Sequence, residues 1–209
     1  MTRHWNGATT AAAAISLSTL LLTGTAAHSE DAVETVVLVR HGEKPDKGLG
    51  QLNCKGLNRA LALPAVIAKV FGKPDAIFAP NPSEQKMDDG KPYDYIRPLA
   101  TIEPTAISFG MPVHASLGVS DTDGLRTALE QPLYRHALIL VAWEHKYIET
   151  IARGLLADYG GDQALVPKWN GDDFDSIYVV TIANAGANAK ATFMVKHEGL
   201  DGQPDACPH

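Results

Sequence analysis

The chain has 209 residues, 45% of them apolar, which is enough for one ordinary globular domain with a full core. Its 24 acidic residues outnumber the 18 basic ones and give a net charge of -6, and no basic run stands out. This charge excludes a protein that follows a nucleic-acid backbone. A mean hydropathy of -0.09 without a long apolar stretch excludes a multi-span membrane protein.

The first 27 residues have the pattern of a secretory signal peptide. Arg3 is the only Lys or Arg before position 40, an apolar or small run follows at 11–22, and small residues lead to Ala27. A membrane anchor is the alternative, but the run is shorter than the roughly 20 residues that span a bilayer. We therefore expect cleavage near Ala27 and a periplasmic or secreted protein without stable membrane insertion.

Export changes the interpretation of the two cysteines. Cys54 and Cys207 lie far apart and form no CxxC motif, so an oxidising compartment would allow one long-range disulfide. Two free thiols are the alternative, because pairing depends on a distance in space. A disulfide would pin the C-terminal tail, residues 201–209, to the single domain that we place at residues 33–200.

Hydrophobic periodicity after the signal peptide alternates between strands and helices. Continuous apolar runs predict buried strands at 36–39, 75–79 and 137–142. Apolar residues at helical spacing predict helices at 54–71, 98–107, 122–133 and 147–159. A polar loop is expected at 81–94, and a short strand at 113–119.

The C-terminal part has the pattern of a hairpin. Strands predicted at 176–182 and 191–196 flank a turn signal at 184–188. The loop at 169–175 (WNGDDFD) is interpreted as a turn before the first of these strands. The order of elements predicts an α/β fold, a three-layer α/β/α sandwich on a mostly parallel sheet with an antiparallel C-terminal hairpin.

Chemically active side chains follow two of the predicted parallel strands, where such folds collect their active sites. Arg40 and His41 come directly after the first strand, and Glu144 and His145 come after the strand at 137–142. An imidazole can attack phosphorus, and a guanidinium beside it can hold phosphate oxygens. Taken singly, each histidine could instead be a surface or helix-capping residue. Structural or surface roles are expected for the domain's other histidines: His114, His136 and His197.

These features resemble the histidine phosphatase superfamily, which has the phosphoglycerate-mutase-like fold. The matching segments span the domain in the family's order: the strand and RHG motif at 37–43, the helix entry at 52–60, the second strand at 75–80, the R-x-x-x-T stretch at 97–101 and the second-histidine strand at 140–145. The RHG tripeptide alone is a weak signal. The whole set in this order is a strong one.

The resemblance implies a metal-independent phosphomonoesterase that needs no cofactor and acts on a small-molecule phosphate ester. His41 would be the nucleophile, forming a phosphohistidine that water hydrolyses. Arg40, Arg97 and His145 would bind the phosphoryl oxygens. A cluster of positive donors around an in-line nucleophile is what phosphoryl transfer requires.

The sequence departs from the family's pattern in three places. The polar loop at 81–94 separates the second strand from Arg97, and Lys146 stands where a glycine often follows the second histidine. No clear match exists for the glutamate that many members carry between the second helix and the late strand.

The general acid is therefore chosen among three carboxylates. Glu144 is the first choice, because a carboxylic acid beside a bound phosphate tends to keep its proton. Neighbouring residues of a strand point to opposite faces, so this role requires the strand to end before Glu144. Otherwise Glu144 would be a structural partner of Arg40 or Arg97. Glu43 and Asp121 are the runners-up.

Two other functions stay open. A non-catalytic protein that binds a phosphate ligand is possible on the same fold, because fold does not fix function. A phosphomutase is the weaker alternative, since it needs a phosphorylated cytoplasmic metabolite. The presence of the nucleophile together with its donors favours catalysis. The sequence predicts no oligomeric state.

Overall fold

The computed structural model describes residues 1, 2, 4, 33–183 and 189–208. The predicted signal peptide lies almost wholly outside these residues, as does the turn signal at 184–188. The described helices and strands are, in chain order, β1 (Val33–Arg40), α1 (Cys54–Val70), β2 (Ala76–Phe78), β3 (Gln85–Asp88), β4 (Lys91–Asp94), α2 (Arg97–Phe109), α3 (Thr122–Leu129), η1 (Pro132–Tyr134), β5 (Leu138–Trp143), α4 (His145–Asp158), η2 (Gln163–Leu165), β6 (Ser176–Ala183) and β7 (Lys190–His197).

Five strands form one sheet in the order β2-β5-β1-β6-β7. The strands β2, β5 and β1 run parallel to one another. β6 pairs antiparallel with β1, and β7 pairs antiparallel with β6. The predicted α/β sheet with an antiparallel C-terminal hairpin is confirmed. Within the described part of the chain, no helix is long and apolar enough to cross a membrane.

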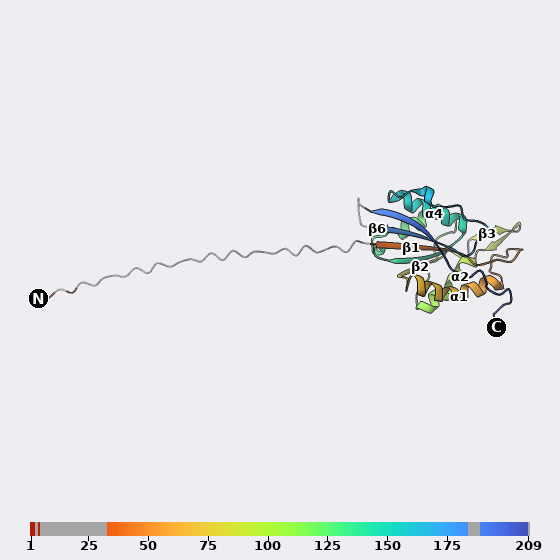
Figure 1. Cartoon of the computed structure of the whole chain (residues 1–209), viewed down its shortest axis with the longest axis horizontal. Coiled ribbons are helices and arrows are strands. Elements are labelled where there is room, and N and C mark those ends of the chain that lie inside the picture. Colours follow the sequence, from red (N-terminus) through yellow and green to blue (C-terminus); the bar gives the residue numbers. More distant parts are fainter. Residues whose placement is uncertain (3, 5–32, 184–188, 209) are drawn as a thin grey trace.

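Side-chain alternation along the strands fills one core on each face of the sheet. Val36 and Leu38 pack on the side of α3 and α4, whereas Val37 and Val39 pack on the side of α1 and α2. Figure 1 shows α4 on one side of the sheet and α1 and α2 on the other. Because both faces are covered, the central strands consist of continuous apolar residues.

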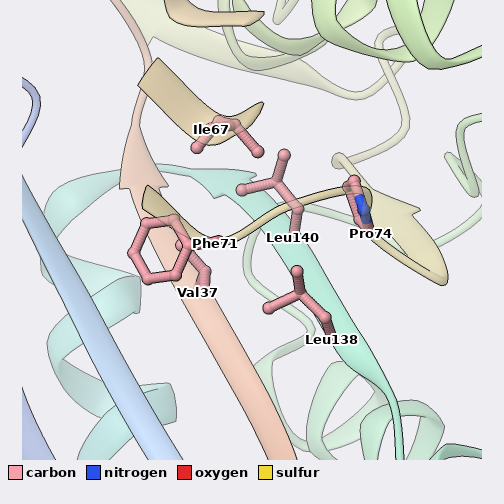
Figure 2. Close-up of a pocket in the computed structure, with 6 residues that line it drawn as sticks. All are labelled: Val37, Ile67, Phe71, Pro74, Leu138 and Leu140. Carbon is pink, nitrogen blue, oxygen red and sulfur yellow. The ribbon is translucent and has the colours of Figure 1, made fainter. Parts of the chain in front are cut away.

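Figure 2 shows the core between α1 and the sheet. Val37, Leu138 and Leu140 extend from β1 and β5 toward Ile67 and Phe71, which lie at the end of α1. The hollow among these side chains has no space for a water molecule. This region therefore contributes close apolar packing.

Two predicted elements are shorter in the structure. The segment at 113–119 was predicted as a strand, and it contributes a single bridge between His114 and Phe78. The helix predicted at 122–133 ends at Leu129. Pro132 lies beyond that end, and a proline inside the helix would remove a backbone hydrogen bond.

The polar loop at 81–94 is wrong as a prediction, because most of it forms a hairpin of β3 and β4. Its turn residues, Asp89 and Gly90, have positive φ values of 50° and 75°. Two consecutive positive φ values are what a tight two-residue hairpin turn requires, and Asp-Gly is a favoured pair for it. The hairpin projects beside the carboxyl end of the sheet (Figure 1).

A disulfide joins Cys54, the first residue of α1, to Cys207 in the C-terminal tail. The amide of Asn58 donates hydrogen bonds to the carbonyl oxygens of Pro204 and Ala206, at 2.9 and 2.8 Å. The sequence left the pairing of the cysteines open, and the structure places the tail along the first turns of α1.

Arg59 is fully buried in α1 and binds carboxylates from three segments of the chain. It donates to both oxygens of Glu43 at 3.0 and 2.9 Å, to Glu198 at 2.7 Å, to Asp201 at 2.9 Å and to Asp175 at 3.4 Å. A buried charge is stable only when it is paired. Arg59 therefore holds the tail and the residue after the RHG motif against α1.

Candidate active site

The carboxyl ends of β1 and β5 lie side by side at one edge of the sheet. The two strands pair in parallel, with Arg40 opposite Trp143. His41 follows β1, and its backbone N–H donates to the carbonyl oxygen of Trp143 at 3.1 Å. Glu144 and His145 follow β5. The pairing register thus brings the two histidines to the same edge.

The imidazole of His41 is buried and oriented by its own loop. Its Nδ1 lies 2.8 Å from the carbonyl oxygen of Gly42. A carbonyl oxygen only accepts, so we assign the proton to Nδ1, which leaves a lone pair on Nε2. Burial lowers the pKa of His41 well below its usual range, and the charges of Arg97 and Arg40 lower it further. The ring is therefore neutral near pH 7, the form that can act as a nucleophile.

Gly42 connects the RHG motif to both helices on its side of the sheet. Its N–H donates to the hydroxyl of Thr101 at 2.9 Å, and that hydroxyl donates to the carbonyl oxygen of Arg97 at 2.8 Å. A Cβ atom on residue 42 would lie 2.9 Å from the carbonyl oxygen of Gly56 in α1. Only glycine permits this close approach. The R-x-x-x-T stretch is thus one turn of α2 that binds the motif.

Arg97 is the buried first residue of α2, and a carboxylate from the hairpin anchors it. Its Nη1 donates to Asp88 of β3, which also accepts from Nζ of Lys44 at 3.2 Å. Its Nε has no hydrogen-bond partner among the described residues. Arg97 is therefore fixed through one nitrogen and keeps a free donor for a ligand.

Arg40 is anchored by the loop at 169–175. Its Nη1 donates to the carbonyl oxygens of Gly171 and Asp173, both at 2.7 Å, and its guanidinium carbon lies 3.7 Å from the centroid of the Phe174 ring. The loop contains the predicted turn before β6, and it also holds Arg40, a role that was not predicted. The density of Asp, Asn and Gly in WNGDDFD was the available signal.

Glu144 and His145 contact each other at the start of α4. β5 ends at Trp143 and α4 begins at His145, with Glu144 as the helix cap between them, so strand alternation no longer separates Glu144 from His145. Its Oε1 lies 3.2 Å from Nδ1 of His145, without hydrogen-bond alignment, and 3.8 Å from Nζ of Lys86. Burial lowers the pKa of His145, and the nearby charge of Arg40 lowers it further.

The two runner-up carboxylates have other partners. Asp121 caps α3, where it accepts from the N–H of Gly124 at 2.9 Å. Both oxygens of Glu43 bind Arg59. Of the three candidates, Glu144 is the one whose carboxylate lies beside His145.

Four side chains that surround the site were not predicted from the sequence: Lys86, Asp88, Tyr95 and Phe174. Tyr95 is buried, and its ring lies edge-on to that of His41 with 6.0 Å between the centroids. Only Asp88 had a local signal, the Asp-Gly turn that directly follows it. The other three act through contacts that cross the fold.

Several buried polar atoms converge here without a partner in the described part of the chain: Nε of Arg40, the hydroxyl of Tyr95, Nε of Arg97 and Nδ1 of His145. Leaving such an atom unsatisfied costs about 1–3 kcal/mol. Most of them can donate a hydrogen bond, and the surrounding charge is positive. An oxygen-rich anion such as phosphate fits this set of donors.

Residues 33–183 and 189–208 contain no group of three or more His, Cys, Asp or Glu side chains placed to hold a metal ion. The expectation that the chemistry needs no metal stays a prediction.

Comparisons of the sequence with protein-family models and with curated proteins found no match. Solved structures with a similar fold include one assigned as the phosphohistidine phosphatase SixA of Nakamurella multipartitia, with 18% identity, a TM-score of 0.52 and coverage of 79% of this chain and 96% of that one. A mycobacterial glucosyl-3-phosphoglycerate phosphatase has 13% identity, a TM-score of 0.52 and coverage of 78% and 97%. A phosphoglycerate mutase from Plasmodium falciparum has 14% identity, a TM-score of 0.51 and coverage of 78% and 89%.

These three proteins are members of the histidine phosphatase superfamily. The chain therefore has the phosphoglycerate-mutase-like fold of that superfamily, as its sequence resemblance predicts.

The anchored geometry of Arg97 predicts that lysine cannot replace it. Arg97→Lys should weaken the binding of inorganic phosphate by about tenfold or more, because an ammonium cannot bind Asp88 and a phosphate oxygen through separate, fixed nitrogens. Calorimetric titration measures this loss. Arg126→Lys, which changes an arginine that binds Asp123 and Asp158 on α3 and α4, is the matched control and should bind phosphate normally. Equal affinities for both variants would show that Arg97 is not a phosphate ligand.

Proposed function

We propose that this protein is an exported phosphomonoesterase that hydrolyses small phosphate esters through a phosphohistidine at His41. The observation that carries the proposal is the buried imidazole of His41, whose Nδ1 is bound to a carbonyl oxygen and whose Nε2 keeps its lone pair. The donors Arg40, Arg97 and His145 lie around it. Two of the similar structures are described as phosphatases, which supports the same chemistry on this fold.

The reaction has two steps in this proposal. First, Nε2 of His41 forms a bond to phosphorus while the ester bond to the leaving oxygen breaks, and the leaving oxygen takes a proton from the carboxyl group of Glu144. Second, a water molecule attacks phosphorus and gives its proton to Glu144, and the bond between Nε2 and phosphorus breaks. Arg40, Arg97 and His145 stabilise the charge on the phosphoryl oxygens in both steps.

The alternatives remain a non-catalytic phosphate-binding protein and, more weakly, a phosphomutase. A protein that only binds phosphate has no need of a neutral, oriented imidazole beside its arginines. Tight binding of phosphate without turnover of any ester would favour the first alternative.

The phosphohistidine can be tested by chemical trapping. Wild-type protein mixed with a labelled phosphate ester and quenched rapidly should carry an acid-labile, base-stable label, because a bond between phosphorus and an imidazole nitrogen has this stability. His41→Ala should carry none and should lose turnover. His114→Ala, which changes an exposed histidine outside the site, is the control and should be labelled like the wild type. Unimpaired turnover by His41→Ala would end the proposal.

The role of Glu144 predicts a dependence on the leaving group. Glu144→Gln should slow the hydrolysis of alkyl phosphates by about 10²–10⁴, because their leaving oxygen needs a proton. Hydrolysis of p-nitrophenyl phosphate should change far less, since its leaving group departs without one. Kinetics on both esters measure the contrast. Asp121→Asn, which removes the carboxylate but keeps a side-chain oxygen that can cap α3, should show no such contrast. Equal losses on both esters for Glu144→Gln would mean that it only orients its neighbours.

Export is the remaining part of the proposal. The disulfide between Cys54 and Cys207 is compatible with folding in an oxidising compartment. The mature protein should begin shortly after Ala27 and be recovered from the periplasmic fraction or the medium, which N-terminal sequencing can check. A native protein that begins with Met1 or Thr2 would contradict export.

A further inference from the structure

The hairpin of β3 and β4 directs two charged side chains at the candidate site. Residues alternate along β3, so Lys86 and Asp88 are partly buried while Gln85 and Met87 are exposed. Asp88 binds Arg97, on the phosphate-binding side of the site. Lys86 lies beside Glu144, the proposed general acid. The two inward side chains therefore border different parts of the site.

The ammonium group of Lys86 is held in place without a hydrogen bond. Its Nζ lies 5.0 Å from the ring centroid of Tyr95, 5.3 Å from that of Tyr147 and 3.8 Å from Oε1 of Glu144. Within the described part of the chain it has no acceptor at hydrogen-bond distance, and its side chain keeps 30% of its exposure. The aromatic rings stabilise the cation in this position. Its N–H groups remain open to a ligand.

Lys86 lies among charges of both signs. Burial lowers the pKa of Lys86, the nearby Glu144 raises it, and Arg97 and Lys146 lower it. A bound anion would stabilise the charged form of Lys86 against this burial. The phosphoryl oxygens already have Arg40, Arg97 and His145 as donors. Lys86 is thus an additional cation.

The position of Lys86 identifies the part of the substrate that it would meet. Glu144 must reach the leaving oxygen to protonate it, so a group 3.8 Å from Glu144 faces the alcohol portion of the ester. We propose that Lys86 makes the enzyme selective for phosphomonoesters whose alcohol portion carries a second acidic group. This inference rests on the proposed function, because it uses the direction in which the leaving group departs.

The test compares three esters with one carbon skeleton: propyl phosphate, the same ester with a terminal carboxylate, and the same ester with a terminal second phosphate. Wild-type protein should prefer at least one acidic ester over propyl phosphate by about tenfold to a hundredfold in kcat/KM, the value of a charged hydrogen bond. The difference should lie mainly in KM. The two acidic esters distinguish a carboxylate from a phosphate as the preferred group.

Lys86→Met removes the charge and keeps a side chain that can pack on both tyrosine rings. It should abolish the preference, because kcat/KM for the acidic esters should fall about tenfold to a hundredfold further than kcat/KM for propyl phosphate. Lys55→Met is the matched control, because Nζ of Lys55 lies 3.9 Å from a carboxylate of Glu43 and its side chain has the same 30% exposure. This control should keep the preference.

The outcomes separate the inference from the function on which it rests. An equal loss on all three esters for Lys86→Met would mean that Lys86 only positions Glu144, and the inference would fall while the phosphatase stands. A wild type without preference would also overturn it.

If no ester is hydrolysed, the proposed function fails. Calorimetry still tests Lys86 in that case, with propylphosphonate and its terminally carboxylated and phosphonylated analogues as ligands. Tighter binding of an acidic analogue, lost in Lys86→Met, would support the subsite, and equal binding would refute it.

Discussion

The parallel pairing of β1 with β5 is the interaction on which the candidate site depends. Its hydrogen bonds place Arg40 opposite Trp143, so the residues that follow each strand enter the same space. A slip by one residue would turn every side chain of β1 to the other face of the sheet. The two apolar cores oppose such a slip, because each strand contributes alternate residues to both. The burial of apolar side chains therefore fixes where the histidines meet.

The second constraint is the cost of keeping cations buried beside a neutral imidazole. Arg40 and Arg97 are both almost fully buried, and the protein anchors them in different ways. Neutral carbonyl oxygens hold Arg40, whereas the carboxylate of Asp88 holds Arg97 and is shared with Lys44. Burial keeps His41 unprotonated by lowering its pKa, and the charges of Arg97 and Arg40 lower that pKa further. The same two guanidinium groups attract an oxyanion.

Local patterns predicted the parts of the fold that local chemistry determines. Continuous apolar runs located β1 and β5 because strands covered on both faces contain few polar residues. The charged residues at their ends then followed from the general position of active sites in α/β sheets. The hairpin was missed because four-residue strands with exposed polar faces give no apolar run. Its Asp89-Gly90 turn was the one signal of pairing.

The contacts that orient the arginines could not be predicted from the sequence. Arg40 and the carbonyl group of Gly171 are 131 positions apart, and a carbonyl group carries no sequence signature. The same holds for Lys86, whose neighbours come from two other segments of the chain: Tyr95 follows β4, and Glu144 and Tyr147 lie at the start of α4. Residue types identified the candidate nucleophile and donors. The orientation of these side chains depends on backbone groups of loops. A residue of almost any type provides the same backbone groups, so the sequence does not reveal them.

The C-terminal tail is coupled to the same site through the first turns of α1. Gly56 packs on Gly42. Arg59 binds Glu43, the residue that follows Gly42 in the chain. The tail covers the other side of these turns. Its Cys207 forms the disulfide with Cys54, and the carboxylates of Glu198, just before the tail, and of Asp201, its first residue, bind Arg59. A shift of α1 would therefore move the loop that carries His41. The disulfide limits that shift, so it constrains the segment around the nucleophile as well as the end of the chain.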